Sequence, residues 1–383
     1  MKQYDFIISG GGAAGLSLAY YLSCSSLKAK KILIIDKDRK NKNDRTWGFW
    51  SKQKTAFDHL ATLRFEELDF ESSYYHKRIS MGAYSYKLIR GIDFYNFIKD
   101  HLSHFPNIEF LNTPIKYLSN TQNEGRVETE QGSFSAPWVF NSIFNEDEIR
   151  QAAASKLYLR QHFKGWLIET PEARFDPSSF SMFDFRTPQQ GLMRFFYLIP
   201  FSQNRALVEY TLFSEDLLED SQYDNAIKNY IREVLKIDKY KIVEEEKGVI
   251  PMTDYTFPAS QGKHIINIGS VGGSSKPSSG YTFMRIQKHV QKIVAALEAG
   301  QSPHISGQSK ARYRFYDSIL LNILKTRGDQ AERLFSLMFK NNSIRQLFQF
   351  LDEQGGIIND LKIISSLPPM PFLRSAVNLI FKK

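Results

Sequence analysis

The sequence predicts an α/β protein in which a unit built on parallel strands is interrupted by an antiparallel sheet and followed by helices. Three observations lead to this prediction. An apolar run at Asp5–Ser9 enters a glycine cluster and then a helical pattern. Short aromatic runs alternate with polar residues from Leu157 to Thr211, as in antiparallel strands. The segment from Ala311 to Gln354 has the periodicity of amphipathic helices.

The composition limits the class of protein. The 383 residues suit two domains or one elaborated domain, and 42% hydrophobic residues can form a sizeable core. The 30 Phe and 19 Tyr can line a large apolar cavity or simply fill that core. A single cysteine, Cys24, excludes an intrachain disulfide and favours a reducing, cytoplasmic location. We expect neither a signal peptide nor a membrane span, since no apolar stretch approaches about 20 residues.

The N-terminal segment reads as a βαβ unit. A strand at Asp5–Ser9 precedes a helix at Ala13–Ser23, and a second buried strand lies within Lys30–Asp38. Gly10, Gly12 and Gly15 form the G-x-G-x-x-G spacing at the turn between strand and helix. This context predicts a Rossmann-like, dinucleotide-binding unit.

Each residue of this fingerprint has a distinct expected task. Gly10 permits the tight turn, Gly12 lets the backbone approach a pyrophosphate, and Gly15 lets helix and strand pack closely. The helix N-terminus offers N–H groups and partial positive charge to the phosphates. Asp36 ends the second strand and can accept hydrogen bonds from ribose hydroxyls.

A second glycine loop, "NIGSVGGSSKPSSGYTF", precedes a helix expected to run from Gly280 to Gly300. In FAD-binding folds of the glutathione-reductase and hydroxylase type, such a helix directs its N-terminus at the pyrimidine edge of the flavin. Its dipole would stabilise the negative charge of a reduced flavin. The return loop therefore favours FAD over NAD(P) as the bound cofactor.

These features divide the chain into four expected segments. Residues 1–154 form the first part of the FAD-binding domain, which includes a helix at Arg90–Leu102 and a strand meander. Residues 155–246 form an inserted antiparallel sheet that would bind substrate. Residues 247–306 return to the FAD-binding domain, and residues 307–383 form a C-terminal helical region.

Four blocks, the last of which is the second glycine loop, resemble those of the lycopene cyclase family, the FAD-dependent lycopene beta-cyclases. They are "NDRTWGFW", "FDPSSFSMFDFR", "FFYLIPFSQNRALVEYT" and "IGSVGGSSKPSSGYTF", in the order expected for the family across nearly the whole chain. Two positions depart from related patterns. Tyr210 stands where many relatives carry a second acid, and Ser270 replaces the aspartate that flavin hydroxylases place after the glycine.

The resemblance implies an enzyme of carotenoid biosynthesis, an isomerase that converts the linear ends of lycopene to β-ionone rings and so makes β-carotene. It implies FAD held in the reduced state, with NAD(P)H as the expected electron donor and no net redox change. The chemistry adds a proton to carbon and later removes one, through a carbocation that needs a dry, aromatic-lined site and an acid.

Glu209 is the catalytic residue that the resemblance implies, and its context agrees. It lies in the strand-like run "ALVEYTLF", where burial would raise its pKa and keep it protonated. Alternation places it on one face with Leu207 and Thr211, opposite Val208 and Tyr210. A salt-bridged glutamate on a sheet is the alternative interpretation. Whether Glu209 protonates the polyene directly or supports a reduced flavin that manages the proton stays open.

The expected cofactor contacts come from the two glycine loops and the segment after the second strand. They are Gly10, Gly12, Ala13, Ala14, Gly15, Asp36, Lys37, Arg45, Gly269, Gly272, Pro277, Gly280 and Tyr281. Arg45 would reach the nucleotide or lie solvated in its loop, and Lys276 would neutralise an anionic flavin. The histidines show no metal-ligand spacing, so no metal is expected.

The C-terminal segment from Gly307 to Lys383 is basic, with 12 Lys and Arg against 6 Asp and Glu, a net charge of +6. No nucleic-acid motif accompanies this charge, so we expect peripheral contact with the inner face of the membrane, or a helical cap over the flavin domain, or both. Two alternatives to a cyclase stay open: a polyprenyl reductase or hydroxylase of the same flavin fold, and a non-catalytic carotenoid-binding protein that carries FAD.

Overall fold

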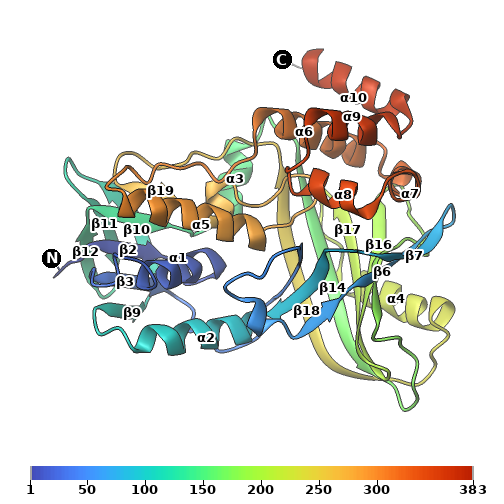
Figure 1. Ribbon diagram of the computed structural model, residues 1–383, viewed down its shortest axis with the longest axis horizontal. Helices are drawn as coiled ribbons and strands as arrows, with labels where there is room; N and C mark the ends of the chain where they lie inside the picture. Colours follow the sequence, from blue (N-terminus) through green and yellow to red (C-terminus); the bar gives the residue numbers. More distant parts are fainter. Residues whose placement is uncertain (1, 382–383) are drawn as a thin grey trace. The chain divides into compact units, whose positions relative to one another are not determined.

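The computed structural model describes residues 2–381 and divides into two compact units (Figure 1). Unit 1 comprises residues 1–47, 89–152 and 255–309, and unit 2 comprises residues 48–88, 153–254 and 310–383. The chain therefore passes between the units several times. The α/β fold class and the interruption of the first unit by a sheet are confirmed.

Unit 1 is built on a parallel sheet of five strands in the order β19-β13-β2-β3-β9. These strands are β2 (Phe6–Ser9), β3 (Ile32–Asp36), β9 (Ile108–Asn112), β13 (Trp138–Asn141) and β19 (Ile265–Asn267). The strands β2, β3, β13 and β19 are short, mostly apolar runs because both faces of the sheet are covered there, whereas the edge strand β9 exposes Glu109 and Phe110. Ile7, Leu33 and Val139 pack in one cluster with Val127 of the neighbouring meander.

The remaining elements of unit 1 flank this sheet. A four-stranded sheet has the order β1-β12-β11-β10, with β1 (Lys2–Gln3), β10 (Ile115–Asn120), β11 (Gly125–Thr129) and β12 (Gly132–Ala136). The helices are α1 (Ala13–Ser23), α2 (Gly91–Ser103), α3 (Glu146–Ala152) and α5 (Phe283–Glu298), with the 3₁₀ turn η3 (Gly269–Gly272). The Gln287 amide of α5 donates a 2.9 Å hydrogen bond to the Ser17 hydroxyl of α1, which joins the helices that carry the two glycine loops.

Unit 2 contains a seven-stranded sheet in the order β18-β14-β17-β16-β15-β6-β7. The strands are β6 (Glu67–Glu71), β7 (His76–Ser80), β14 (Tyr158–Glu169), β15 (Ser179–Asp184), β16 (Met193–Ser202), β17 (Arg205–Ser214) and β18 (Lys241–Thr253). The pairings among β14 to β18 are antiparallel, as predicted, whereas β15 pairs with β6 in parallel. A smaller sheet has the order β4-β8-β5, with β4 (Thr46–Ser51), β5 (Leu63–Phe65) and β8 (Ser85–Arg90).

Helices complete unit 2. They are the 3₁₀ turn η1 (Asp58–Leu60), α4 (Asp220–Asn229), the π-helical turn η2 (Tyr230–Val234), α6 (Ala311–Thr326), the 3₁₀ turn η4 (Gly328–Gln330), α7 (Ala331–Asn341), α8 (Ile344–Leu351), α9 (Ile357–Ser365) and α10 (Pro369–Phe381). The last five α-helices give the C-terminal helical region that the amphipathic pattern predicts.

The units differ from the predicted segments in two places. Residues 48–88, expected within the FAD-binding domain, belong to unit 2 because β6 pairs with β15 of the large sheet. The strand β18 runs through the expected boundary at residue 246, because its whole length pairs with β14.

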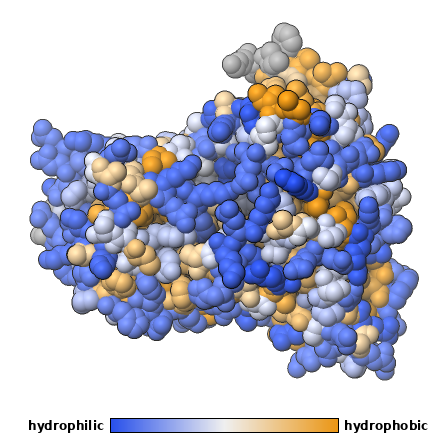
Figure 2. All heavy atoms as spheres, viewed as in Figure 1, coloured by the Kyte–Doolittle hydropathy of each residue, from blue (hydrophilic) through white to orange (hydrophobic). Residues whose placement is uncertain are grey.

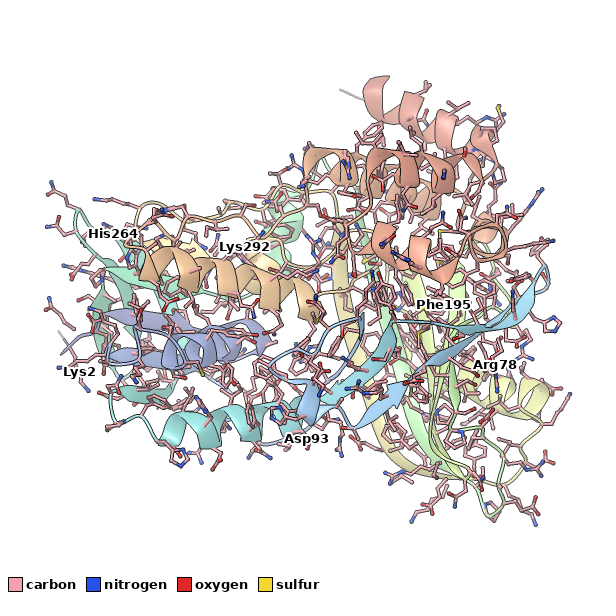
Figure 3. All side chains as sticks on the ribbon, in the orientation of Figure 1. Lys2, Arg78, Asp93, Phe195, His264 and Lys292 are labelled. Carbon is pink, nitrogen blue, oxygen red and sulfur yellow. The ribbon has the colours of Figure 1, made fainter. Side chains whose placement is uncertain are left out.

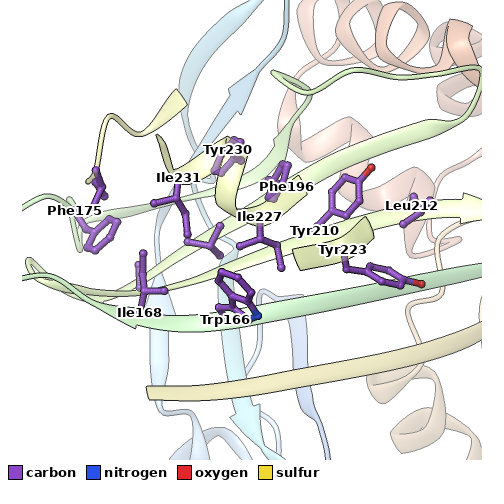
Figure 4. Close-up of a cluster of buried hydrophobic side chains, with 13 residues drawn as sticks. Trp166, Ile168, Phe175, Phe196, Tyr210, Leu212, Tyr223, Ile227, Tyr230 and Ile231 are labelled. Atoms are coloured by element: carbon purple, nitrogen blue, oxygen red, sulfur yellow. The ribbon is translucent and has the colours of Figure 1, made fainter. Parts of the chain in front are cut away.

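One face of the large sheet is closed by α4 and η2 (Figure 4). Trp166, Phe196 and Tyr210 from the strands pack there against Tyr223 and Tyr230 from the helices. The Tyr230 and Phe196 rings stack with centroids 3.8 Å apart. The Tyr230 hydroxyl donates a 2.6 Å hydrogen bond to the fully buried Asp184 carboxylate, which therefore anchors η2 to β15.

We expect Tyr230→Phe to lower the free energy of unfolding by about 1.5–3 kcal/mol, because it removes a hydrogen bond to a buried charge and keeps the stacked ring. Urea denaturation measures the change. The matched control is Tyr74→Phe, since Tyr74 is 60% exposed. Equal midpoints for the two variants would contradict the anchoring role of Tyr230.

Candidate functional site

The loop after β2 is shaped by its first glycine. Gly10 has φ +104°, a conformation that L side chains rarely adopt, and a Cβ there would lie 2.3 Å from the Ser142 hydroxyl. That hydroxyl donates to the carbonyls of Ser9 and Gly10, at 3.0 and 3.1 Å. Ser142 is a loop-supporting residue that the sequence analysis did not identify, since it is distant in sequence and no motif marks it.

The other two glycines of the fingerprint have separate roles. A Cβ on Gly15 would lie 1.9 Å from the Gly10 carbonyl oxygen and 2.9 Å from Ile8 Cγ2, so Gly15 is required for close packing of α1 on β2. A Cβ on Gly12 would meet nothing within 4 Å. The fold itself therefore needs Gly10 and Gly15, whereas the space at Gly12 is open to a ligand.

The N-terminus of α1 faces this open space. Gly12 is the N-cap residue and supplies no side chain to bond the first N–H groups of the helix, at Ala13 and Ala14. Uncapped N–H groups and the positive end of the helix dipole form an anion site. The arrangement suits a pyrophosphate, as the fingerprint predicts.

Asp36 lies beside the loop at the end of β3. Its Oδ2 accepts a 2.6 Å hydrogen bond from the Gly11 N–H, and its Oδ1 accepts a 2.7 Å bond from the Asp38 N–H. These bonds orient the carboxylate, whose remaining lone pairs can accept from ribose hydroxyls. Lys37, the next residue, is exposed.

Two hydrogen bonds, one to the backbone and one to a side chain, fix the loop that carries Arg45. The Arg45 carbonyl accepts a 2.8 Å hydrogen bond from the Gly91 N–H, and the Tyr95 hydroxyl donates a 2.8 Å bond to Asp44. The guanidinium is 54% exposed and lies 3.2 Å from the Asp44 carboxylate. A nucleotide contact by Arg45 stays a prediction.

The return loop lies against the first turn of α1. A Cβ on Gly269, which has φ +66°, would lie 2.9 Å from the Ala14 Cβ, so the two loops meet at this point. A Cβ on Gly272 would lie 2.4 Å from the Asn267 carbonyl oxygen. The structure thus brings together the two glycine segments that the sequence analysis paired.

The last part of the return loop is a closed turn. The Gly280 N–H donates to the Lys276 carbonyl at 2.9 Å, and the Lys276 N–H donates to the Tyr281 carbonyl at 3.1 Å. This turn holds Pro277 and Gly280, the latter at φ +70°. Because the turn uses these residues, α5 begins at Phe283 rather than at the predicted Gly280.

Two features of this turn suit a polar ligand. The Ser279 hydroxyl is buried without a hydrogen-bond partner among the described residues, which is unusual for a native structure. Thr282 is the N-cap residue of α5, but its hydroxyl bonds to the Gly280 carbonyl and the Ser275 hydroxyl of the loop. It therefore does not cap the helix. The loops of unit 1 therefore fit a phosphate-bearing and polar cofactor such as FAD.

A second candidate site lies on the large sheet of unit 2, at Glu209 in β17. Its carboxyl accepts a 3.0 Å hydrogen bond from the Thr211 hydroxyl. Burial, followed by the charge of Glu246 and a hydrogen bond with it, raises the pKa of Glu209 well above the usual range, although the Thr211 bond acts in the opposite direction. The raised pKa favours the protonated form of Glu209, and no lysine or arginine contributes to the shift.

Alternation along β17 places Glu209 on the face predicted. Val208 and Tyr210 point to the cluster beneath α4 (Figure 4). Tyr210, which stands where many relatives have a second acid, accepts a 3.2 Å hydrogen bond from Arg194 within that face. Its position therefore adds no carboxyl beside Glu209.

Aromatic rings occupy the Glu209 face. Tyr197 is opposite Glu209 in the β16–β17 register, and Phe195 is opposite Thr211. Figure 3 labels Phe195. The Phe195 ring lies 5.2 Å from the Tyr197 ring and 4.9 Å from that of Phe183. Ring faces of this kind stabilise cations. An acid with a raised pKa and several aromatic rings therefore share this face of the sheet.

The sequence analysis did not identify Glu246, a carboxyl on this face that raises the pKa of Glu209. Glu246 and Glu209 both pair with Gly165 of β14, from opposite sides. The acidic run "EEE" is visible in the sequence, but it does not show which of its residues meets Glu209. Only the register of the three strands β18, β14 and β17 places Glu246 beside Glu209. Among residues 2–381, no group of three or more His, Cys, Asp or Glu side chains is placed to hold a metal ion.

The fold is that of flavoproteins. A flavoprotein/dehydrogenase from Cytophaga hutchinsonii matches with a TM-score of 0.63 at 12% identity, over 100% of both chains. A geranylgeranyl bacteriochlorophyll reductase-like protein from Thermoplasma acidophilum matches with a TM-score of 0.59 at 13% identity, over 98% of both chains. At these identities the likeness concerns the fold alone.

The family follows from the sequence. The model of the lycopene cyclase protein family matches residues 5–377, so the chain belongs to the lycopene cyclase family. A lycopene beta-cyclase from Paracoccus sp. (strain N81106 / MBIC 01143) is 27% identical over 226 residues. That match covers 55% of this chain and 57% of the relative. The family assignment made from the four sequence blocks is confirmed.

The division of roles among the glycines leads to a prediction. We expect Gly15→Ala to lower the free energy of unfolding by at least about 1–3 kcal/mol, because the added methyl group overlaps the Gly10 carbonyl. Gly12→Ala is the control, since its φ of −85° suits alanine and its surroundings are open. Thermal unfolding without added ligand compares them, and equal midpoints would refute the assigned roles.

Proposed function

We propose that the protein cyclises the linear ends of lycopene to β-ionone rings and so makes β-carotene, with reduced FAD and without net redox change. The observation that carries this proposal is Glu209, an acid with a raised pKa among aromatic rings, in a chain of the lycopene cyclase family. Substrate and product are isomers, so the reaction needs a proton donor and a proton acceptor but no stoichiometric reductant.

FAD is the proposed cofactor of unit 1. Gly12, Ala13 and Ala14 would hold its pyrophosphate, and Asp36 its ribose. The return loop, with Gly269, Gly280 and the unpartnered Ser279 hydroxyl, would hold a further part of the cofactor. When bound and reduced, FAD supplies an anionic ring system, and NAD(P)H is the proposed electron donor. The Gly12→Val variant is expected to fold but to purify without flavin absorbance.

The residues of unit 2 supply the proton chemistry. Glu209, held neutral by burial, donates its proton to a terminal double bond of the polyene. The chain closes to a six-membered ring as the adjacent double bond attacks the cation. Tyr197, Phe195 and Phe183 stabilise the positive charge and exclude water that would trap it. Loss of a ring proton to a carboxylate then restores the double bond.

The test is pigment analysis in lycopene-accumulating cells, followed by anaerobic turnover of purified protein with photochemically reduced flavin. We expect many rings per flavin without NAD(P)H, with flavin still reduced and deuterium from D₂O in each ring. Glu209→Gln should retain fold and flavin but lose activity by about 10²–10⁴-fold. One ring per flavin with matching oxidation would indicate a reductase or hydroxylase, and unchanged lycopene would indicate a binding protein.

A peripheral membrane location is proposed for the C-terminal helices. In Figure 2 hydrophobic side chains gather over these helices. The C-terminal apolar patch consists of side chains that are 51–73% exposed on α9 and α10, namely Ile357, Ile358, Leu361, Met370, Leu373 and Val377. The exposed Lys362 and Arg374 accompany it, and the segment 307–383 carries a net charge of +6. No helix of the described residues is both long enough and apolar enough to cross a bilayer.

We expect this patch to bind vesicles that contain anionic lipid, because apolar side chains enter the interface and basic ones attract the headgroups. Vesicle flotation at rising salt measures binding. Ile358→Glu with Leu373→Glu should abolish it, whereas Leu217→Glu, at another exposed apolar position of unit 2, should not. Undiminished binding by the double variant would overturn the docking surface.

A further inference from the structure

Two glutamates approach each other across the second strand of the large sheet, next to its edge strand β18. The strands β18, β14 and β17 are neighbours in that order, and Gly165 of the middle strand pairs with Glu246 on one side and Glu209 on the other. Side chains in register on adjacent strands project from the same face. Both carboxyl groups therefore stand on one face, with only a hydrogen atom of Gly165 between their stems.

The missing side chain at Gly165 makes this approach possible. A Cβ there would lie 3.2 Å from Glu246 Cγ, 3.3 Å from Glu209 Cβ and 2.9 Å from Leu207 Cδ1. Any other residue would fill the space through which the glutamates meet. Glycine weakens a strand interior, and its presence there often marks a close approach.

The contact between the carboxyl groups requires a proton. The charge of Glu246 and a hydrogen bond with it raise the pKa of Glu209, and such a bond needs a proton on one carboxyl because two ionised carboxylates have no hydrogen to share. Two carboxyl groups in one site favour a state in which one of them is protonated, because the second charge is repelled by the first.

The strand alternation separates Glu246 from its neighbour in the same acidic run. Glu245 points to the other face, where its carboxylate lies 3.5 Å from the Lys164 ammonium and is 54% exposed. Lys164 also pairs with Asp224 of α4 on that face. Glu245 is therefore a matched control for Glu246, with the same side chain on the same strand.

The other groups on the Glu209 face come from the strands around it and from one packed helix. Tyr197 faces it from β16, Thr211 from its own strand, and Glu244 is placed on the same face of β18 by alternation. The middle strand contributes Gly165, and the packed helix α7 contributes Phe335, which lies 5.2 Å from Phe183 between ring centroids. Among the described residues, Glu246 is the charged group that acts on the pKa of Glu209.

We propose that Glu209 and Glu246 form a carboxyl pair that shares one proton near neutral pH, in which Glu246 is the positioning residue that keeps Glu209 ready to protonate the substrate. This inference rests on the proposed function. The Glu209 O–H bond breaks as the new C–H bond of the substrate forms, which leaves a doubly charged pair. That pair is a stronger base, and it regains a proton when the ring C–H bond breaks and its electrons form the double bond. No oxidant or reductant is consumed.

The first test measures stability, without activity. Because the folded pair holds a proton that the unfolded chain releases, the free energy of unfolding should fall as pH rises from the ordinary glutamate value, about 4.3, to the raised one. Glu246→Gln should remove part of this fall, so its urea midpoint exceeds that of wild type near pH 8 but not near pH 4. Glu245→Gln should follow the wild-type profile. If the Glu246 variant also follows it, the pair does not exist.

The second test measures the reaction. Without Glu246 the pKa of Glu209 drops, and each unit below the assay pH costs about tenfold in the protonated fraction. Glu246→Gln should therefore lose about 10-fold or more in kcat near pH 8, recover activity as pH falls, and keep KM for lycopene in liposomes. Glu245→Gln should keep the wild-type pH profile.

The outcomes separate the two proposals. An inactive Glu209→Gln with a Glu246→Gln that has the wild-type pH profile overturns the pair and leaves the cyclase function standing. An active Glu209→Gln overturns the proposed proton donor itself. A loss in the Glu246 variant that is equal at all pH values overturns the proton-holding role, because a merely structural change would not depend on pH.

Discussion

The carboxyl of Glu209 lies where its ionised form is disfavoured. The residues on both faces of the large sheet of unit 2 can be interpreted in terms of this constraint. Desolvation and the nearby Glu246 both raise the pKa of this half-buried carboxyl, and the raised pKa favours its protonated form. The face around it carries Tyr197, Phe195 and Phe183, which offer no positive charge to pull the proton away. The opposite face of the same strand is covered by the cluster that contains Tyr210 and Tyr230.

The three glycines of the fingerprint in unit 1 serve two purposes: two are needed by the fold, and one leaves space for a ligand. The fold itself requires Gly10 and Gly15. Gly10 has a positive φ, and a Cβ on Gly15 would lie 1.9 Å from the Gly10 carbonyl oxygen. Gly12 has no such internal reason, because a side chain there would meet nothing. A glycine without a structural reason, at the uncapped end of a helix, indicates a ligand more strongly than the spacing alone.

Much of the fold could be predicted because its signals are local. The helix at Ala13–Ser23 has the predicted ends, since the glycine cluster and the apolar periodicity lie in one short segment. The face of Glu209 followed from alternation along a single strand. Glu246 was not identified, and residues 48–88 were placed in the FAD-binding domain, because their positions depend on pairings between strands far apart in the chain. The start of α5 moved to Phe283 because hydrogen bonds of the Lys276 turn compete with the helix.

The parallel sheet of unit 1 also bears on the order in which the chain can fold during synthesis. Its strand β13 ends at Asn141, but its neighbour β19 begins only at Ile265. At about 5–20 residues per second, the ribosome needs on the order of ten seconds to supply that partner. Throughout this interval the hydrogen-bonding edge of β13 is open to other chains. The edge of β13 therefore lacks its native partner strand until residues 265–267 have been synthesised.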